Sequence, residues 1–299
     1  MAPSAPRGVI AAIATAIDPH GEPDCGRSIA LARHLLAQGC DGLNVLGTTG
    51  EATSFSAPQR QNVMNAYHEA GLPLSRCLVG TGAAAVADAI ALTAHAADLG
   101  FGGALLLPPF YYKNVADDGL FVYVERIVAA TDARPIPLYL YHFPALSSVP
   151  WPLPLIGRLI EAFGPRIRGL KDSSGDMNYA RAAAAIAQDF DVFPSTEAAL
   201  MEARAGRFAG CISATVNLNS DLCARAYRAG DADALAHARA IRNLLDGTPL
   251  IAAVKTLLAH IHADHAWTRL APPLSGLNSA DSAAIIAGYD RIRTASRAA

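Results

Sequence analysis

Short apolar runs alternate with longer amphipathic segments along most of this chain. The apolar runs are rich in Val, Ile and Leu and contain few polar positions. That pattern is typical of parallel β-strands that are buried on both faces. The expected strands are Val9–Ile17, Gly42–Thr48, Cys77–Gly82, Gly103–Pro108, Pro137–Phe143, Ile167–Lys171, Asp191–Pro194 and Gly210–Thr215.

The segments between these runs carry apolar residues at helical spacing. The expected helices are Cys25–Gln38, Ala57–Ala70, Val86–Leu99, Gly119–Ala130, Pro154–Phe163, Tyr179–Gln188 and Ala198–Ala205. Strands that each precede a helix, eight times in succession, indicate an α/β protein with the (β/α)8 TIM barrel fold. A doubly wound open sheet is the alternative. That fold usually carries a Gly-rich phosphate turn after its first strand, whereas here the first run leads into Thr15-Ala16-Ile17-Asp18-Pro19.

Beyond about residue 218 the pattern becomes helical throughout. We expect helices at Asn219–Ala229, Ala232–Leu245, Leu250–His262 and Ser279–Ile292, with a Pro-rich break at 271–276. The eighth helix of the barrel therefore leads into a C-terminal helical extension. The sequence predicts a catalytic barrel over residues 1–224 and a helical region over 225–299.

Composition excludes several classes of protein. The chain has 299 residues, of which 52% are hydrophobic and 17% charged, and its net charge of −2 favours neither nucleic acid nor an anionic membrane as a partner. No apolar stretch is long enough to span a bilayer, and the first residues do not resemble a signal peptide. The five scattered cysteines are typical of reduced, buried thiols. We therefore expect a cytoplasmic protein.

Lysine is rare in this sequence. Only three of its 24 Lys and Arg side chains are lysines, namely Lys113, Lys171 and Lys255. Lys171 ends an apolar run, so its amine should be partly desolvated. Such an amine loses its proton more readily and can attack a ketone to form a Schiff base, which an arginine cannot do. The competing interpretation is a lysine on a surface turn that pairs with Asp172 or Asp176.

Further candidate groups follow the second and fifth strands. In Gly47-Thr48-Thr49-Gly50-Glu51, two hydroxyls and several backbone N–H groups precede a helix, which makes a cradle suited to a carboxylate. The structural interpretation is a Gly-rich turn with Thr as the helix N-cap. In the fifth strand, Tyr139 and Tyr141 share one face. A phenol near a Schiff-base lysine can transfer protons.

Three motifs together resemble a known family. Gly47–Glu51, Tyr141-His142-Phe143-Pro144 and Gly169-Leu170-Lys171-Asp172-Ser173-Ser174-Gly175-Asp176 are similar, in order and spacing, to the signatures of the dihydrodipicolinate synthase / N-acetylneuraminate lyase family. The resemblance extends over essentially the whole chain. It implies a metal-independent class I aldolase or lyase that acts on pyruvate or another 2-oxo acid and needs no cofactor beyond its own lysine.

The resemblance also implies roles for individual residues. Lys171 would form the Schiff base, and Tyr141 would transfer protons beside it. Thr48 and Thr49, together with Gly47, would hold the carboxylate of the 2-oxo acid, and Thr48 would also relay protons.

The oligomeric state follows from the same resemblance. Tyr111 matches a tyrosine that reaches into the active site of a neighbouring subunit in this family. A homotetramer or homodimer is therefore expected.

Departures from the family pattern bear on the substrate. In dihydrodipicolinate synthases an arginine binds the carboxylate of aspartate semialdehyde, but Leu146 stands at that place and cannot pair with a carboxylate. Sialic-acid lyases carry an Asp-Glu pair after the seventh strand, whereas this chain keeps only Glu197. We expect Glu197 and Ser195 to contact hydroxyl groups, and we count Ser213 among the substrate-binding residues. A 2-keto-3-deoxy or 4-hydroxy-2-oxo acid is the expected substrate.

Other functions stay open at this point. One alternative is a 4-hydroxy-tetrahydrodipicolinate synthase that uses another basic group. The others are a dehydratase of keto-deoxy acids and a non-catalytic sensor of 2-oxo acids. A sensor would not need an amine nucleophile. A metal-dependent aldolase is disfavoured because the nine histidines lack ligand spacing at strand ends.

Overall fold

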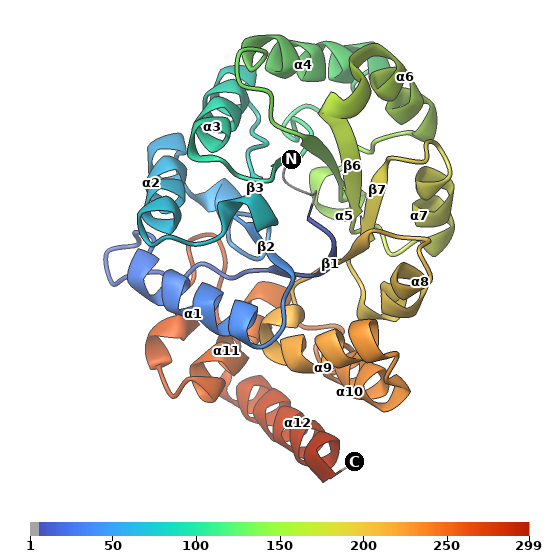
Figure 1. Cartoon of the computed structure of the whole chain (residues 1–299). Coiled ribbons are helices and arrows are strands. Elements are labelled where there is room, and N and C mark those ends of the chain that lie inside the picture. The colour runs from blue at the N-terminus through green and yellow to red at the C-terminus, as the bar shows by residue number, and fades with distance from the viewer. Residues whose placement is uncertain (1–5, 299) are drawn as a thin grey trace.

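A closed ring of parallel strands forms the centre of the molecule. The computed structural model describes residues 6–298, and within them eight strands form one sheet that curls into a barrel (Figure 1). The strands are β1 (Gly8–Ala12), β2 (Gly42–Val45), β3 (Cys77–Gly80), β4 (Gly103–Leu106), β5 (Leu138–His142), β6 (Ile167–Asp172), β7 (Asp191–Pro194) and β8 (Gly210–Ser213). They pair in the order β7-β6-β5-β4-β3-β2-β1-β8. The N–H group of Ala209 donates to the carbonyl of Val192 at 3.0 Å and links β7 to β8. The expected (β/α)8 barrel is confirmed.

Helices surround the strands (Figure 1). They are α1 (Cys25–Ala37), α2 (Ala57–Glu69), α3 (Val86–Leu99), α4 (Asp117–Ala130), α6 (Leu153–Phe163), α7 (Met177–Ala184), α8 (Leu200–Arg204) and α9 (Val216–Ala229). Side chains define where several of them begin. Asp24 accepts the N–H group of Arg27 at the start of α1, and Ser56 and Gln59 form a capping box at the start of α2. A short helix that the sequence did not predict, α5 (Pro144–Ser147), follows β5 directly.

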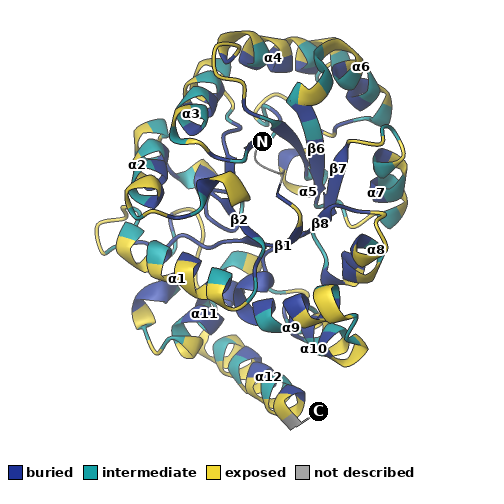
Figure 2. Ribbon diagram, viewed as in Figure 1, coloured by how far each residue is buried: buried dark blue, intermediate teal, exposed yellow. Residues whose placement is uncertain are grey.

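The inside of the barrel is filled by side chains from alternate strand positions, and Figure 2 shows the strands as buried. Tyr139 and Tyr141 both belong to this inner cluster, so the prediction that they share a face is confirmed. Two glycines make room for the ring of Tyr139. A Cβ atom on Gly103 would lie 2.5 Å from that ring, and a Cβ atom on Gly169 would lie 2.8 Å from it. Glycine is therefore required at both positions.

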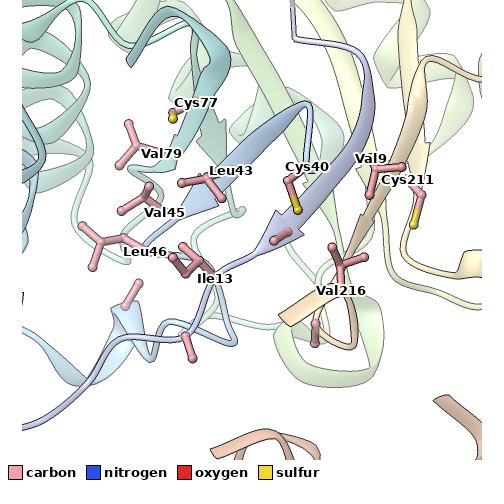
Figure 3. Close-up of a cluster of buried hydrophobic side chains, with 14 of the residues drawn as sticks. Val9, Ile13, Cys40, Leu43, Val45, Leu46, Cys77, Val79, Cys211 and Val216 are labelled. Atoms are coloured by element: carbon pink, nitrogen blue, oxygen red, sulfur yellow. The ribbon is translucent and has the colours of Figure 1, made fainter. Parts of the chain in front are cut away.

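A second apolar layer fills the space between the strands and the helices. Figure 3 shows part of it, where side chains of β1, β2, β3 and β8 point outward. Val9, Leu43, Val45 and Val79 are buried there. Burying an aliphatic side chain of this size contributes about 1.5–3 kcal/mol relative to leaving it in water. The strands are thus held on both faces, as their continuous apolar runs predict.

Several strands end earlier than the apolar runs predict. β1 ends at Ala12 instead of Ile17, and β2 ends at Val45 instead of Thr48. Leu46 has a φ of 53°, which takes the chain out of the extended conformation directly after β2. The apolar residues beyond these ends form loops at the carboxyl ends of the strands, where the active sites of barrels lie.

The C-terminal helices pack outside the ring (Figure 1). They are α10 (Ala232–Leu244), α11 (Leu250–Ile261) and α12 (Ser279–Ala298). The hydroxyl of Tyr289 donates to the carbonyl of Leu218 at 3.0 Å, and Arg293 pairs with Asp221, so α12 is fixed to α9. The boundary predicted after residue 224 falls inside α9, because that helix continues to Ala229. Within residues 6–298, none of the helices is both long and apolar enough to cross a membrane.

A buried ion pair joins this extension to the loop after β2. The amine of Lys255 in α11 contacts the carboxylate of Glu51, and both side chains are fully buried. Lys255 also donates to the carbonyl of Arg269 at 2.8 Å, and Glu51 accepts the N–H group of Ala271 at 2.7 Å. Burial lowers the pKa of Lys255, and the neighbouring Glu51 opposes that shift. The loop that carries Thr48 and Thr49 is therefore tied to the C-terminal helices.

Candidate active site

Lys171 is buried in the wall of the barrel. It lies near the end of β6, beside Tyr141 in the register between β5 and β6. Its amine nitrogen lies 4.3 Å from the centre of the Tyr141 ring. Asp172 accepts the N–H group of Ser174, and Asp176 caps α7. The interpretation of Lys171 as a lysine on a surface turn is therefore wrong, because β6 carries its side chain into the protein interior.

The hydroxyl groups of Tyr141 and Thr48 form a hydrogen bond. Their oxygen atoms lie 3.0 Å apart, and either can be the donor. Tyr141 is buried, whereas Thr48 is partly accessible, so the pair connects the lysine to the surface of the site. A pair of hydroxyls in this position can pass a proton between the amine and a bound molecule.

The loop after β2 brings Gly47 and Thr49 to the same place. Its backbone turns tightly, because the N–H groups of Glu51 and Ala52 donate to the carbonyls of Thr48 and Gly47. A Cβ atom on Gly47 would lie 3.9 Å from the amine of Lys171. That separation is an ordinary van der Waals contact, so the backbone of Gly47 passes directly beside the lysine.

A cavity of about 620 Å³ opens at the carboxyl ends of the strands. Five of the residues expected in the site line it, and these are Thr48, Thr49, Tyr141, Lys171 and Ser195. The structure therefore brings together the lysine, the phenol and the hydroxyl cradle predicted from sequence. The hydroxyl of Ser195 also bonds to that of Ser173 at 2.7 Å. Leu146, which is 63% exposed, lies at the rim.

Glu197 and Ser213 lie behind the wall of this cavity and do not line it. The Glu197 side chain is 0% exposed. Its carboxylate accepts hydrogen bonds from the hydroxyls of Ser213, at 2.8 Å, and Thr215. The expectations that Glu197 contacts substrate hydroxyls and that Ser213 belongs to the substrate-binding residues are corrected, because the two residues bind each other beneath the surface of the site.

Tyr111 lies outside the cavity of its own chain. It follows β4, is 73% exposed and packs edge to face against Tyr112. Nearby, Lys113 donates to the carbonyl of Ser147 at 2.9 Å. An exposed tyrosine in this position is free to contact another subunit, and its role in a neighbouring active site stays a prediction.

Burial shifts the pKa values of two side chains next to the cavity, those of Asp172 and His142. Desolvation raises the pKa of Asp172, against the opposing hydrogen bonds from Ser174. Burial also lowers the pKa of His142 to about 4. The Nδ1 atom of His142 accepts the N–H group of Trp151 at 3.0 Å, and its ring stacks on that of Tyr179. His142 is therefore a neutral, structural side chain.

Two polar residues at or beside the site were not predicted from the sequence. Arg242, on α10, lines the cavity, although nothing in the helical pattern of that segment distinguishes it from other exposed arginines. Asn44, in β2, has a fully buried amide that finds no protein partner within residues 6–298. A Cβ atom on Gly47 would lie 2.5 Å from its Nδ2 atom. An Asn within an apolar strand is a signal that could have identified the second residue.

Comparisons with known proteins agree with this geometry. The model of the dihydrodipicolinate synthetase family matches residues 5–275. A protein of Chloroflexus aurantiacus described as a DapA-like lyase is 33% identical over 297 residues, which cover 96% of this chain and 97% of the relative. The 4-hydroxy-tetrahydrodipicolinate synthase of Hyphomonas neptunium is 32% identical over 229 residues, or 76% of each chain. The crystal structure of dihydrodipicolinate synthase from Agrobacterium tumefaciens superposes with a TM-score of 0.89 at 29% identity, covering 95% of this chain and 99% of that one.

The fold and the cavity define a barrel enzyme with a buried lysine at the carboxyl ends of its strands. The matches identify the family more closely. This chain belongs to the dihydrodipicolinate synthetase family, and it is a lyase of the aldolase type.

Proposed function

We propose that the protein is a class I aldolase in which Lys171 forms a Schiff base with pyruvate or a related 2-oxo acid. The observation that carries the proposal is the buried amine of Lys171, 4.3 Å from the ring centre of Tyr141, whose hydroxyl lies 3.0 Å from that of Thr48. Imine chemistry needs a nucleophile and groups that transfer protons. Lys171 is the nucleophile, and Tyr141 and Thr48 are the proton-transfer groups. No metal or other cofactor has a part in this scheme.

The proposed reaction proceeds through an imine. The amine of Lys171 attacks the keto carbon, and the keto oxygen leaves as water with two protons, which Tyr141 and Thr48 help to move. The imine nitrogen takes up a proton and becomes an iminium. The bond between C3 and C4 then breaks, its electron pair gives an enamine, and the C4 hydroxyl loses its proton to become an aldehyde. Protonation at C3 and hydrolysis release pyruvate and free Lys171.

The proposed substrates are 2-keto-3-deoxy acids and 4-hydroxy-2-oxo acids, in the direction of either cleavage or condensation. Thr48 and Thr49 would hold the carboxylate next to the keto group, and Ser195 lies on the wall where a hydroxyl of the substrate would pass. A second candidate is 4-hydroxy-tetrahydrodipicolinate synthase, the activity named for the Hyphomonas neptunium relative. Leu146 argues against it, because an apolar side chain stands at the place where the resemblance puts the arginine that binds the semialdehyde carboxylate.

We further propose a homotetramer or homodimer in the cytoplasm. The exposed side chain of Tyr111 supports the assembly, since it is accessible to a neighbouring subunit. The five cysteines form no disulfide within the described residues, and unpaired thiols persist in a reducing compartment.

The experiment that tests the activity measures pyruvate released from 2-keto-3-deoxygluconate and from 4-hydroxy-2-oxoglutarate. We expect release by the wild-type protein and none above background by Lys171→Arg, which keeps the positive charge but cannot form an imine. Lys113→Arg is the matched control, because Lys113 lies outside the cavity, and it should retain activity. Full release by Lys171→Arg would contradict the proposal.

A further inference from the structure

Arg242 reaches the cavity from the C-terminal helix α10. Its side chain is 33% exposed, and its Nη1 atom donates to the carboxylate of Glu197 at 3.4 Å and to the hydroxyl of Ser213 at 3.3 Å. Within residues 6–298, its Nε and Nη2 donors have no protein acceptor. The guanidinium is therefore held at Nη1 by Glu197 and Ser213, and it lines the cavity with two donors that these residues do not use.

The group that holds Arg242 is itself fixed. Glu197 is fully buried, and its other carboxylate oxygen accepts the hydroxyls of Ser213 and Thr215. A carboxylate fixed in this way orients an arginine without the loss of side-chain entropy that a mobile surface pair would require. Glu197, Ser213 and Thr215 therefore form a buried support that fixes Arg242 at the wall of the site.

The other residues around the cavity leave Arg242 as the natural partner of an anion. Among the described residues that line it, only Lys171 and Arg242 have basic side chains. Leu146, Pro249, Leu250 and Leu274 form apolar parts of the wall. A second acidic group on the substrate would find a charged donor at Arg242 alone, since Lys171 is committed to the keto carbon.

We infer that Arg242 binds a second carboxylate, at the end of the substrate remote from the keto group, so that the enzyme prefers dicarboxylic 2-oxo acids. The inference rests on the proposed function, which sets Lys171 and the Thr48–Thr49 cradle at the keto end. A carboxylate fits better than a phosphate, because the buried Glu197 already offsets the charge of Arg242 and Asp172 adds a carboxyl group to the same cavity. A doubly charged phosphate would therefore meet more repulsion from these two carboxyl groups than a singly charged carboxylate does.

The test compares matched pairs of 2-oxo acids that differ only in the distal group. 2-Oxoglutarate is paired with 2-oxopentanoate, and 2-oxoadipate with 2-oxohexanoate, and their binding is measured by calorimetry. The wild-type protein should bind at least one dicarboxylate about 10- to 100-fold more tightly than its partner, which is the size of one charge-assisted hydrogen bond. Arg242→Met should reduce that ratio to about 2 or below. Arg242→Lys, which keeps the charge but not the forked geometry, should retain part of it.

Control variants separate carboxylate recognition by Arg242 from a purely structural role of its side chain. Arg239→Met removes the same charge from an exposed position of α10 and should leave the ratio unchanged. Arg242→Gln replaces Arg242→Met if the latter fails to fold. If Arg242 only supports the structure, both members of each pair will weaken equally, and the inference is wrong. A wild-type protein without any dicarboxylate preference at either length also overturns it.

Two further measurements distinguish the ligand classes and the underlying function. Binding of 2-keto-3-deoxy-6-phosphogluconate is compared with that of 2-keto-3-deoxygluconate, and a phosphate preference larger than the carboxylate preference would overturn the assignment. Borohydride reduction with pyruvate reports on the imine separately. If no adduct forms, the proposed function fails, while the binding ratios still decide whether Arg242 recognises a carboxylate.

Discussion

Replacing Lys255 by methionine should destabilise the protein strongly, because it would leave the carboxylate of Glu51 buried without its cation. Both side chains are fully buried in the folded protein. After the substitution, Glu51 would keep the N–H group of Ala271 as a donor, and the carbonyl of Arg269 would lose the donor that Lys255 provides. The charge could then be accommodated only by protonation or by local unfolding.

Breaking a buried pair from one side costs about 3–5 kcal/mol, against a total free energy of unfolding of about 5–15 kcal/mol for a typical domain. We expect Lys255→Met to lower the free energy of unfolding by that amount in urea denaturation monitored by circular dichroism. The double variant Lys255→Met/Glu51→Gln removes the stranded charge and should recover a large part of the loss. Substrate binding should also weaken in the single variant, because Glu51 ends the loop that carries Thr48 and Thr49.

The exposed ion pair between Arg134 and Asp98 provides the matched control. Arg134→Met should cost less than about 1 kcal/mol, since water screens such a pair. The destabilising effect of the unpaired charge is refuted if Lys255→Met costs no more than this control. It is equally refuted if the double variant is as unstable as the single variant, because the loss would then come from packing and not from an unpaired charge.

Three further predictions address the site and its surroundings. Tyr141→Phe should still bind pyruvate but slow turnover by roughly 10²–10⁴-fold in steady-state assays, and near-normal turnover would remove the phenol from the proton path. Condensation of pyruvate with aspartate semialdehyde should be weak, and Leu146→Arg should raise its kcat/KM, whereas efficient condensation by the wild-type protein would show that another group binds that carboxylate. Between about pH 6.5 and pH 4 the unfolded chain gains a proton on His142 that the folded protein does not, so the free energy of unfolding should fall as the pH is lowered through this window. His142→Asn, which can still accept from Trp151, should flatten that decline in denaturation curves.

The barrel could be predicted because its signals are local. Each strand is a continuous apolar run, and each helix has its own periodicity, so neither depends on distant parts of the chain. The ends of the strands were harder to predict. Residues 13–17 continue the apolar character of β1 but leave the sheet, and their apolar side chains are buried in the core between the strands and the helices. Hydrophobicity alone does not separate a strand from such a buried loop.

Some residues of the site could likewise be predicted from the sequence, and others could not. Lys171, Tyr141 and the Thr48–Thr49 cradle could be placed from sequence, because each ends or follows a strand and strands of one barrel point to one mouth. Glu197 also follows a strand, yet its carboxylate faces Ser213 instead of the cavity. That outcome depends on contacts between distant segments, which periodicity does not encode. The position of Arg242 depends entirely on such contacts, because only the packing of α10 brings its side chain to the cavity wall.

The most direct test of the central claim is to trap the imine on Lys171. The protein is incubated with pyruvate, reduced with borohydride and digested, and the peptides are analysed by mass spectrometry. With Lys171 as the nucleophile, we expect a reduced pyruvyl adduct on the peptide that contains Lys171, and none on Lys113 or Lys255. Absence of any adduct, or an adduct confined to one of the other two lysines, would contradict it.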